Sequence, residues 1–280
     1  MANQRPLFQH PEQETHFRKH GYVIVPFFDA EALMKARELS SRLNGGFNTP
    51  FTTTIWSEDK AYRKEVLDEL KKLYQAPTDR VLQECKLVMA TILTKHTGEN
   101  SQIDIHQDWS FTDETQYSAV NIWVPLVDTT PQNGALCLLP HSQLFDVPFR
   151  GRHITPQFVN VKNEIWSLGQ PIVAKAGEAI IFDVKMVHYS NPNQTLQTRT
   201  ATAMVAIPRE APILHYINYN PSEHTITAME VDEFFYNSYA HNDPIPRTSN
   251  YSELTLERTQ LSTDLFKREY EKICLKAEEL

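Results

Sequence analysis

Three side chains that could bind a metal ion lie in two segments of the sequence. The first segment, Ile103-Asp104-Ile105-His106-Gln107-Asp108-Trp109, has a histidine and an aspartate two positions apart. In an extended strand alternate side chains share a face, so His106 and Asp108 would point to one side and Gln107 to the other. An imidazole and a carboxylate that converge in this way can hold a divalent metal.

A third ligand follows an apolar, strand-like run later in the chain, where residues 180–187 lead to His188. Two imidazoles and one carboxylate form a facial triad that suits non-haem Fe(II) and leaves positions open for further ligands. Zinc favours a closed or hydrolytic arrangement instead. His106, Asp108 and His188 are therefore predicted to hold iron and to be the catalytic residues.

A second triplet of the same spacing occurs at His241-Asn242-Asp243. It runs directly into Pro244-Ile245-Pro246, a poor context for a strand, and no histidine follows it. With 11 histidines in the chain, roughly half a triplet of this kind is expected by chance. We interpret the second triplet as a chance occurrence in a loop.

Arg199 and Ser190 could bind an organic anion that also chelates the metal. Ser190 follows His188 by two positions, so in a strand both side chains would lie on the same face. Arg199 begins a strand-like run of small residues. A dicarboxylate that binds iron at one end needs a bidentate cation and a hydroxyl group at the other. The charges of Fe(II), Asp108, the dianion and Arg199 would then cancel, which avoids an uncompensated buried charge.

The elements that must position these residues follow from periodicity and from helix-ending glycines. Helices are expected at Glu12–His20, Asp29–Leu43 and Ser57–Tyr74. From about Lys86 the pattern changes to short β-type runs, which predict a closed or sandwiched β-domain. These runs cover residues 87–94, 119–127, 135–139, 172–174, 179–182 and 200–207.

The remaining segments complete a single expected domain over residues 1–280. Pro140–Gln170 contains too many turn residues to be regular and is interpreted as a long insert between strands. After residues 213–219 the chain is expected to be helical, at Glu230–Ala240 and Leu261–Glu279. Along the chain, the domain is expected to consist of N-terminal helices that pack on the core over 1–85, a β-core over 86–220 and a C-terminal helical extension over 221–280.

The composition limits the possible partners. The net charge is -8 and the basic residues are scattered, so a nucleic-acid partner is not expected. No apolar run approaches the ~20 residues that span a bilayer, and the start of the sequence lacks a secretory signal. The three cysteines are far apart, as is typical of reduced thiols. We expect a soluble cytoplasmic protein, monomeric or homodimeric, that acts on a small molecule.

The sequence resembles the phytanoyl-CoA dioxygenase (PhyH) family of Fe(II)/2-oxoglutarate oxygenases over about residues 12–210. The similarity lies in the triplet at 106–108, Asn133-Gly134-Ala135-Leu136, Pro140-His141-Ser142, and His188-Tyr189-Ser190 with Arg199. The chain departs from the family pattern at His141, where the family has a glycine before the serine. The resemblance implies an α+β protein with a mainly β core, a double-stranded β-helix or jelly roll, with flanking helices.

The resemblance also implies cosubstrates and further site residues. The cosubstrates would be 2-oxoglutarate and dioxygen, with oxidative decarboxylation to succinate and oxidation, most simply hydroxylation, of a substrate C–H bond. Trp123 and Thr91 would join Arg199 and Ser190 around 2-oxoglutarate, and Trp109 and Asn121 are the candidate substrate-binding residues. Related halogenases lack the carboxylate that Asp108 supplies, so halogenation is not expected.

Two other functions are open on the residues alone. One is a metal-dependent, cupin-like isomerase or hydrolase that does not use 2-oxoglutarate, against which Arg199 and Ser190 argue. The other is a non-catalytic jelly-roll binding module, which has no need of a metal triad. The substrate is not identified; Arg150, Arg152 and Lys185 give little support for an acyl-CoA at a net charge of -8.

Overall fold

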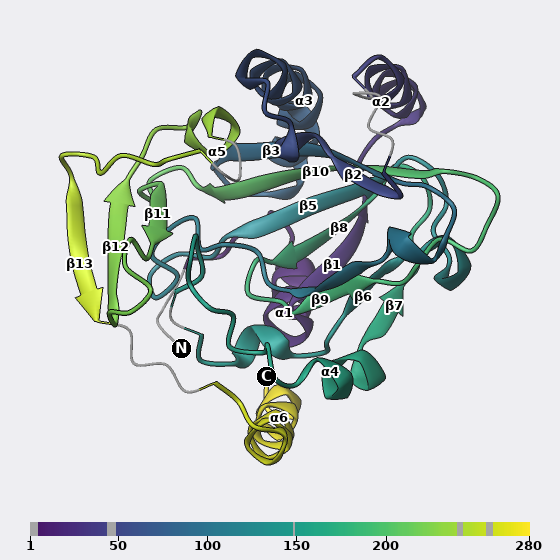
Figure 1. Ribbon diagram of the computed structural model, residues 1–280. Coiled ribbons are helices and arrows are strands. Elements are labelled where there is room, and N and C mark those ends of the chain that lie inside the picture. Colours follow the sequence, from purple (N-terminus) through teal and green to yellow (C-terminus); the bar gives the residue numbers. More distant parts are fainter. Residues whose placement is uncertain (1–4, 44–48, 148, 240–242, 256–259) are drawn as a thin grey trace.

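The computed structural model describes residues 5–43, 49–147, 149–239, 243–255 and 260–280. Helices and antiparallel strands form layers (Figure 1). The helices are α1 (Pro11–His20), α2 (Ala30–Arg42), α3 (Lys60–Val81), α4 (Lys162–Leu168), α5 (Phe235–Ser238) and α6 (Thr263–Glu278). The strands are β1 (Tyr22–Pro26), β2 (Phe51–Thr53), β3 (Cys85–Lys95), β4 (Ile103–His106), β5 (Val120–Pro125), β6 (Leu136–Leu138), β7 (Gln170–Ile172), β8 (Glu178–Asp183), β9 (His188–Ser190), β10 (Arg199–Pro208), β11 (Leu214–Ile217), β12 (Thr225–Glu230) and β13 (Tyr251–Thr255).

Two antiparallel sheets form the centre of the molecule. The larger has the order β1-β8-β5-β10-β3-β2, and the smaller has the order β4-β9-β6-β7. A third sheet, β11-β12-β13, stands at one end (Figure 1). Each strand predicted between residues 87 and 207 is present, with its ends within two residues of the expected ones. The expected combination of helices and a mainly antiparallel β core is confirmed.

Side chains that alternate along the strands of the larger sheet point either to the core under the helices or to the interior between the two central sheets. On β5, Ile122 and Val124 pack in the cluster beneath the N-terminal helices, whereas Trp123 belongs to the cluster between the two central sheets. On β10, Ala201 and Ala203 face the same interior. Because these two side chains are small, they leave room between the sheets.

The helices α2 and α3 cover the outer face of the larger sheet, whereas α1 lies beside the edge strand β1 (Figure 1). The Asp29 side chain caps α2, as expected, and Asp59 caps α3. The prediction ended this helix at Tyr74, the end of its apolar spacing. The helix in fact continues to Val81, since Pro77, Thr78 and Val81 are buried.

The C-terminal part is less helical than predicted. Residues 221–255 contain β12 and β13, and the helix expected at Glu230–Ala240 is reduced to the short α5. The pairing of β12 with β11 and of β13 with β12 explains these strands, because sheet hydrogen bonds override a weak local helical preference. The last helix is confirmed as α6, and its Phe266 and Ile273 pack beside the smaller sheet and the 140–170 segment.

The 140–170 segment has more regular structure than predicted, because it contains α4 and a single helical turn after His141. His141 takes φ +59°, the left-handed region that glycine favours, and its Nδ1 lies 3.0 Å from the carbonyl oxygen of Lys19. The turn therefore keeps its shape with a histidine in place of glycine. Of the second triplet, His241 and Asn242 lie outside the described residues. No described helix is long and apolar enough to cross a membrane.

Candidate active site

The pairing of β4 with β9 brings the three predicted metal ligands together. His106 is the register partner of His188, and their ring centroids lie 4.1 Å apart. Asp108 follows β4, and its Oδ1 lies 3.9 Å from Nε2 of His188. One ligand atom from each of the three side chains lies within 4.8 Å of the others. Two imidazoles and a carboxylate at this separation fit a single metal ion.

Backbone carbonyl groups orient both histidines. Nδ1 of His106 lies 2.8 Å from the carbonyl oxygen of Asp104, and Nδ1 of His188 lies 2.9 Å from that of Met186. A proton on each Nδ1 leaves the Nε2 lone pair for a metal. Burial, with a contribution from His106, lowers the pKa of His188 to about 4. The ring is therefore neutral at pH 7, as a metal ligand must be.

Asp108 is held by two other residues. Its Oδ2 accepts a hydrogen bond from Nδ2 of Asn121 at 2.8 Å, and its carbonyl oxygen accepts one from Nε of Arg150 at 2.7 Å. Asn121 lines the cavity, so its expected contact with substrate stays a prediction. Its hydrogen bond to the carboxylate is a positioning role that the sequence did not indicate.

Arg199 and Ser190 lie in the same cavity and have unused hydrogen-bonding capacity. Arg199 is only 2% exposed; its Nη2 donates to the carbonyl oxygen of Gly134 at 3.0 Å, and its guanidinium carbon lies 5.3 Å from the ring centroid of Trp123. Within the described chain, Nε of Arg199 and Oγ of Ser190 are buried without a hydrogen-bond partner. A buried cation without a carboxylate is costly until an anion completes the site.

Thr91 and Lys95 on β3 flank this anion site. The Thr91 hydroxyl lies 2.5 Å from that of Thr53, so its predicted contact with a cosubstrate carboxylate stays a prediction. Lys95 is the register partner of Arg199, is completely buried, and donates from Nζ to the carbonyl oxygen of Asn191 at 2.7 Å. The sequence did not indicate Lys95, because one lysine in an apolar strand carries no pattern.

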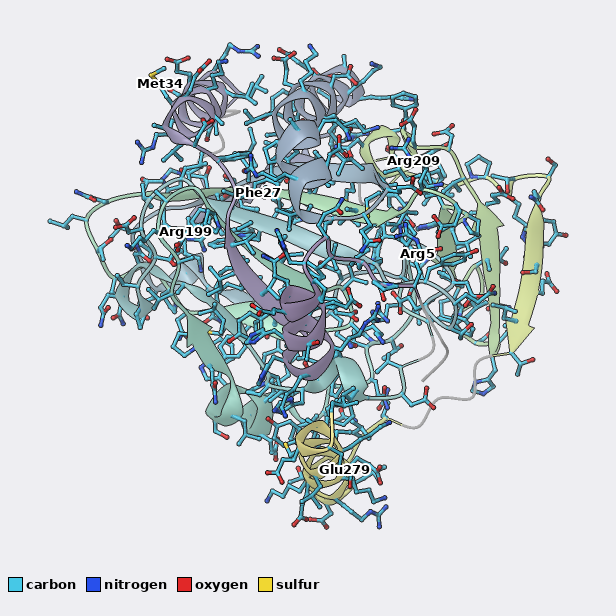
Figure 2. The ribbon with its side chains drawn as sticks, turned by 180° about the vertical axis from the view of Figure 1, so that it is seen from behind. Arg5, Phe27, Met34, Arg199, Arg209 and Glu279 are labelled. Atoms are coloured by element: carbon cyan, nitrogen blue, oxygen red, sulfur yellow. The ribbon has the colours of Figure 1, made fainter. Side chains whose placement is uncertain are left out.

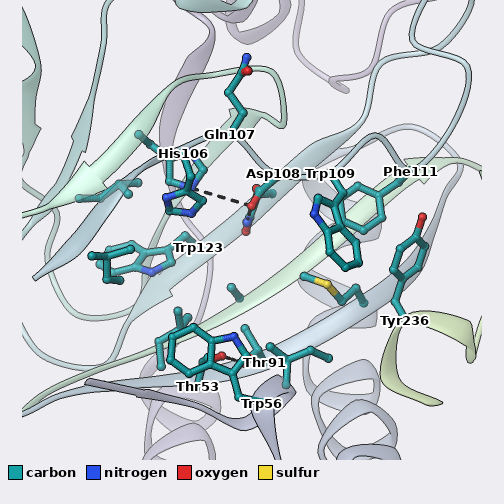
Figure 3. A pocket seen from close by; sticks show the side chains of 18 of the residues that line it. Thr53, Trp56, Thr91, His106, Gln107, Asp108, Trp109, Phe111, Trp123 and Tyr236 are labelled. Atoms are coloured by element: carbon teal, nitrogen blue, oxygen red, sulfur yellow. Dashed lines mark hydrogen bonds and ion pairs between the residues drawn. The ribbon is translucent and has the colours of Figure 1, made fainter. Parts of the chain in front are cut away.

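A cavity of about 360 Å³ between the two central sheets contains all of the predicted site residues. They are His106, Asp108, Trp109, Asn121, Trp123, Thr91, His188, Ser190 and Arg199. Figure 3 shows His106 and Asp108 at one end, with Trp109, Phe111 and Tyr236 further along the wall. The size falls in the range of small-molecule sites.

The far wall comes from α5 and from a segment next to β2, neither of which was predicted to form the site. Phe235, Tyr236 and Tyr239 line the cavity, and Trp56 lines it while being 58% exposed (Figure 3). The dense aromatic run between residues 234 and 239 was the available signal, because aromatic side chains gather at binding sites. It was interpreted only as part of a helix.

The family model "Phytanoyl-CoA dioxygenase (PhyH)" matches residues 17–201, about two thirds of the chain. The chain belongs to the phytanoyl-CoA dioxygenase family. As a member of this family it is an Fe(II)/2-oxoglutarate-dependent oxidoreductase, with iron, 2-oxoglutarate and dioxygen as its cofactor and cosubstrates. The expected family is confirmed.

Two curated relatives of this phytanoyl-CoA dioxygenase family protein differ in coverage. A phytanoyl-CoA dioxygenase domain-containing protein 1 homolog from Dictyostelium discoideum is 31% identical over 38% of this chain and 41% of its own length. A probable alpha-ketoglutarate-dependent hypophosphite dioxygenase from Stutzerimonas stutzeri is 24% identical over 76% of this chain and 84% of its own length. The chain thus spans less than half of the first relative and most of the second.

Solved structures with the same fold are also 2-oxoglutarate-dependent enzymes. The epimerase SnoN, in complex with Fe³⁺, alpha-ketoglutarate and nogalamycin RO, has a TM-score of 0.54 and 18% identity over 88% of this chain and 96% of its own. HygX from Streptomyces hygroscopicus, with nickel, 2-oxoglutarate and hygromycin B bound, has a TM-score of 0.52 and 16% identity over 72% and 88%. At these identities the likeness is one of fold.

Proposed function

We propose that the protein hydroxylates a C–H bond of a small organic molecule. One oxygen atom of dioxygen would enter the substrate and the other would enter succinate, while 2-oxoglutarate loses carbon dioxide. The observation that supports this best is one cavity that has three potential metal ligands at one end, a buried arginine and serine with unused hydrogen-bonding atoms beside them, and free volume beyond. A hydrolase or isomerase without 2-oxoglutarate would leave Arg199 and Ser190 unexplained.

In this proposal each group of side chains has a separate task. His106, Asp108 and His188 hold Fe(II), which supplies dioxygen activation when bound. Arg199 and Ser190 bind the far carboxylate of 2-oxoglutarate, and Trp123 packs against the guanidinium of Arg199. Because the rest of the cavity is largely aromatic, bound substrate would exclude water from the metal.

We further propose that residues 1–280 form one domain around a jelly roll. The strand orders β8-β5-β10-β3 and β4-β9-β6-β7 support this, because consecutive strands from β3 to β10 alternate between the two sheets, except for β6 and β7, which pair within the smaller sheet. β1 and β2 then extend the larger sheet at its two edges. One relative is named for hypophosphite, a small phosphorus oxyanion, and a protein of the same fold has the antibiotic hygromycin B bound. The fold alone therefore does not identify a substrate.

Anaerobic titration of the metal-free protein with Fe(II) and then 2-oxoglutarate tests the proposal. A weak visible charge-transfer band should appear only with both present, and aerobic protein should release succinate. His106→Ala should lose the band and reduce succinate release at least about 100-fold, because an iron ligand is absent. Iron binding without a band would favour an enzyme that does not use 2-oxoglutarate, and undiminished turnover in His106→Ala would contradict the assignment.

A further inference from the structure

Arg152 is a buried cation that lines the cavity. It is 7% exposed, and within the described ranges its guanidinium makes no hydrogen bond or ion pair. An unpaired charge in a largely apolar pocket is costly, because desolvation of a buried ion takes several kcal/mol. A ligand with the opposite charge would remove that cost.

The neighbouring cations differ from Arg152 because carboxylates already neutralise them. Arg150 donates from Nη1 and Nη2 to Glu114 at 2.8 and 2.6 Å, in a buried bidentate pair. Lys185 lies 3.8 Å from Oδ2 of Asp183. Arg152 is therefore the cation in this region that is available to a ligand.

The backbone places Arg152 firmly beside β11. Its N–H donates to the carbonyl oxygen of Tyr216 at 3.0 Å, and its carbonyl oxygen accepts from the N–H of Asn218 at 3.0 Å. The preceding residue must be glycine for this close approach, because a Cβ at Gly151 would lie 2.0 Å from the carbonyl oxygen of Tyr216. The backbone of Arg152 is thus fixed beside the cavity, which limits the positions that its side chain can reach.

Aromatic side chains line the cavity that Arg152 enters. Trp109 and Phe111 line the cavity, and the hydroxyl of Tyr236 donates to the carbonyl oxygen of Leu214, so its hydrogen bond is made within the protein. Burial, with the positive charge of Arg152, lowers the pKa of His215 to about 3, so this neighbour is neutral at pH 7. Arg152 thus adds a second arginine to the described lining of the cavity, apart from Arg199, at the wall that carries Trp109 and Phe111.

We infer that the substrate is a small, mainly apolar organic acid whose single carboxylate pairs with Arg152. This inference rests on the proposed function, in which the charges of iron, Asp108, 2-oxoglutarate and Arg199 cancel, so that among the described residues of the cavity lining Arg152 is left to be neutralised. The planar fork of an arginine matches a carboxylate. A coenzyme A thioester carries several phosphate charges that one arginine does not balance. A small inorganic oxyanion would leave the aromatic wall without a contact.

Matched pairs of ligands test the inference on metal-free protein by calorimetry, so that iron is not required. Benzoate, 4-phenylbutyrate and octanoate are each compared with the corresponding primary amide, and hypophosphite serves as a small oxyanion. We expect at least one acid to bind with a dissociation constant below about 1 mM and about 10- to 100-fold more tightly than its amide, the range for a charged hydrogen-bonded pair. The same acid should shift the charge-transfer band of the protein loaded with Fe(II) and 2-oxoglutarate.

Variants assign the preference to Arg152. Arg152→Gln should weaken binding of the acid to the level of its amide, Arg152→Lys should weaken it partly, and the exposed control Arg209→Gln should leave it unchanged (Figure 2). The side chain of Arg152 makes no hydrogen bond within the described protein, so these variants should fold. Equal binding of acid and amide, no acid binding below about 1 mM, an unaffected Arg152→Gln variant, or hypophosphite binding as tightly as the acids would overturn the inference.

The two proposals fail separately. Acid binding that depends on Arg152, in a protein that forms no charge-transfer band, would reject the proposed function and keep the anion site. A normal band without any preference for acids would reject the anion site and keep the proposed function.

Discussion

Both ligand histidines are oriented in the same local way. Each Nδ1 lies against the carbonyl oxygen of the residue two positions earlier, Asp104 for His106 and Met186 for His188. The orientation therefore depends on backbone and not on a distant side chain. Asp108 differs, because its carboxylate and carbonyl groups are fixed by Asn121 and Arg150, which come from other segments. The carboxylate ligand is the member of the triad whose position needs tertiary contacts.

Replacement of Arg199 by lysine should raise the requirement for 2-oxoglutarate. A lysine keeps the charge but cannot form two parallel hydrogen bonds to a carboxylate, and the lost interaction corresponds to a KM about 10- to 100-fold higher. Turnover at saturating 2-oxoglutarate should change little, because the triad is untouched. Steady-state kinetics with varied 2-oxoglutarate measure this, with Arg209→Lys as the exposed control. An unchanged KM would show that the dicarboxylate binds elsewhere.

Lys95 should make stability depend on pH. Burial, followed by the charge of Arg199, lowers the pKa of Lys95 from 10.5 to about 6, although Cys137 acts in the opposite direction. Between these values the unfolded chain holds a proton that the folded chain lacks, so the contribution of Lys95 to folding stability falls as the pH falls from 10.5 to 6. Lys95→Met removes this dependence.

The Lys95→Met variant should therefore gain stability relative to the parent protein as the pH is lowered from 9 to 6.5, by at most about 1.4 kcal/mol per pH unit. Urea unfolding of both proteins at several pH values measures the difference. The lost hydrogen bond to Asn191 adds a constant offset that does not vary with pH. A difference that is the same at every pH would show that Lys95 keeps its charge in the folded protein.

The turn between β5 and β6 contacts Arg199 and leads directly into β6. A single helical turn, Pro131–Asn133, is capped by Thr130 and ends at Gly134, which has φ +75°. The carbonyl oxygen of Gly134 accepts the hydrogen bond from Arg199. A Cβ at Gly134 would lie 2.5 Å from the carbonyl oxygen of Asn191 and 2.7 Å from Cδ of Lys95. The turn approaches its neighbours as closely as a glycine permits.

Gly134→Ala should destabilise the protein by about 1–3 kcal/mol and also raise the KM for 2-oxoglutarate. The added methyl group must displace the turn that receives Arg199. Gly98→Ala is the matched control, because Gly98 also has positive φ but a Cβ there would meet nothing within 4 Å. The control should lose stability through its backbone alone and keep its KM. Equal kinetic effects in both variants would contradict the proposed link between the turn and Arg199.

Across the whole molecule, the aromatic wall of the pocket depends on contacts between the C-terminal part and the N-terminal helices. Arg63 of α3 is buried and donates to the carbonyl oxygens of Asn237 and Ser238 at 3.0 and 2.9 Å. The Asn237 side chain pairs with both the N–H and the carbonyl oxygen of Ala90 in β3. These contacts hold α5 over the cavity, so the larger sheet, α3 and α5 build one wall together (Figure 1).

Asn237→Leu should lower the free energy of unfolding by about 2–3 kcal/mol, because it leaves the two backbone groups of Ala90 buried without their partner. Loosening of α5 should weaken substrate binding, while the band with Fe(II) and 2-oxoglutarate persists. Chemical denaturation and the anaerobic titration measure the two effects. Asn163→Leu, at an exposed position of α4, is the control. A decrease in the free energy of unfolding below about 0.5 kcal/mol would show that water takes over the hydrogen bonds that the Asn237 amide makes to Ala90.

The sequence by itself determined which residue types are available for the site. His106 and Asp108 lie two positions apart, and His188 and Ser190 repeat that spacing, so the residue types and the strand period already predict a facial triad and an anion partner. The strand positions were predictable for the same reason, because apolar alternation is a property of a short segment. The family resemblance added the cosubstrate.

Only the tertiary structure decided which groups meet. The register that sets His106 opposite His188 joins segments about 80 residues apart in the chain. Arg150 and Arg152 look alike in the sequence, yet in the structure Arg150 pairs with Glu114, whereas Arg152 lines the cavity. The strands β12 and β13 and the wall from α5 also form through distant pairing. Such contacts follow from packing between remote segments, which no local pattern records.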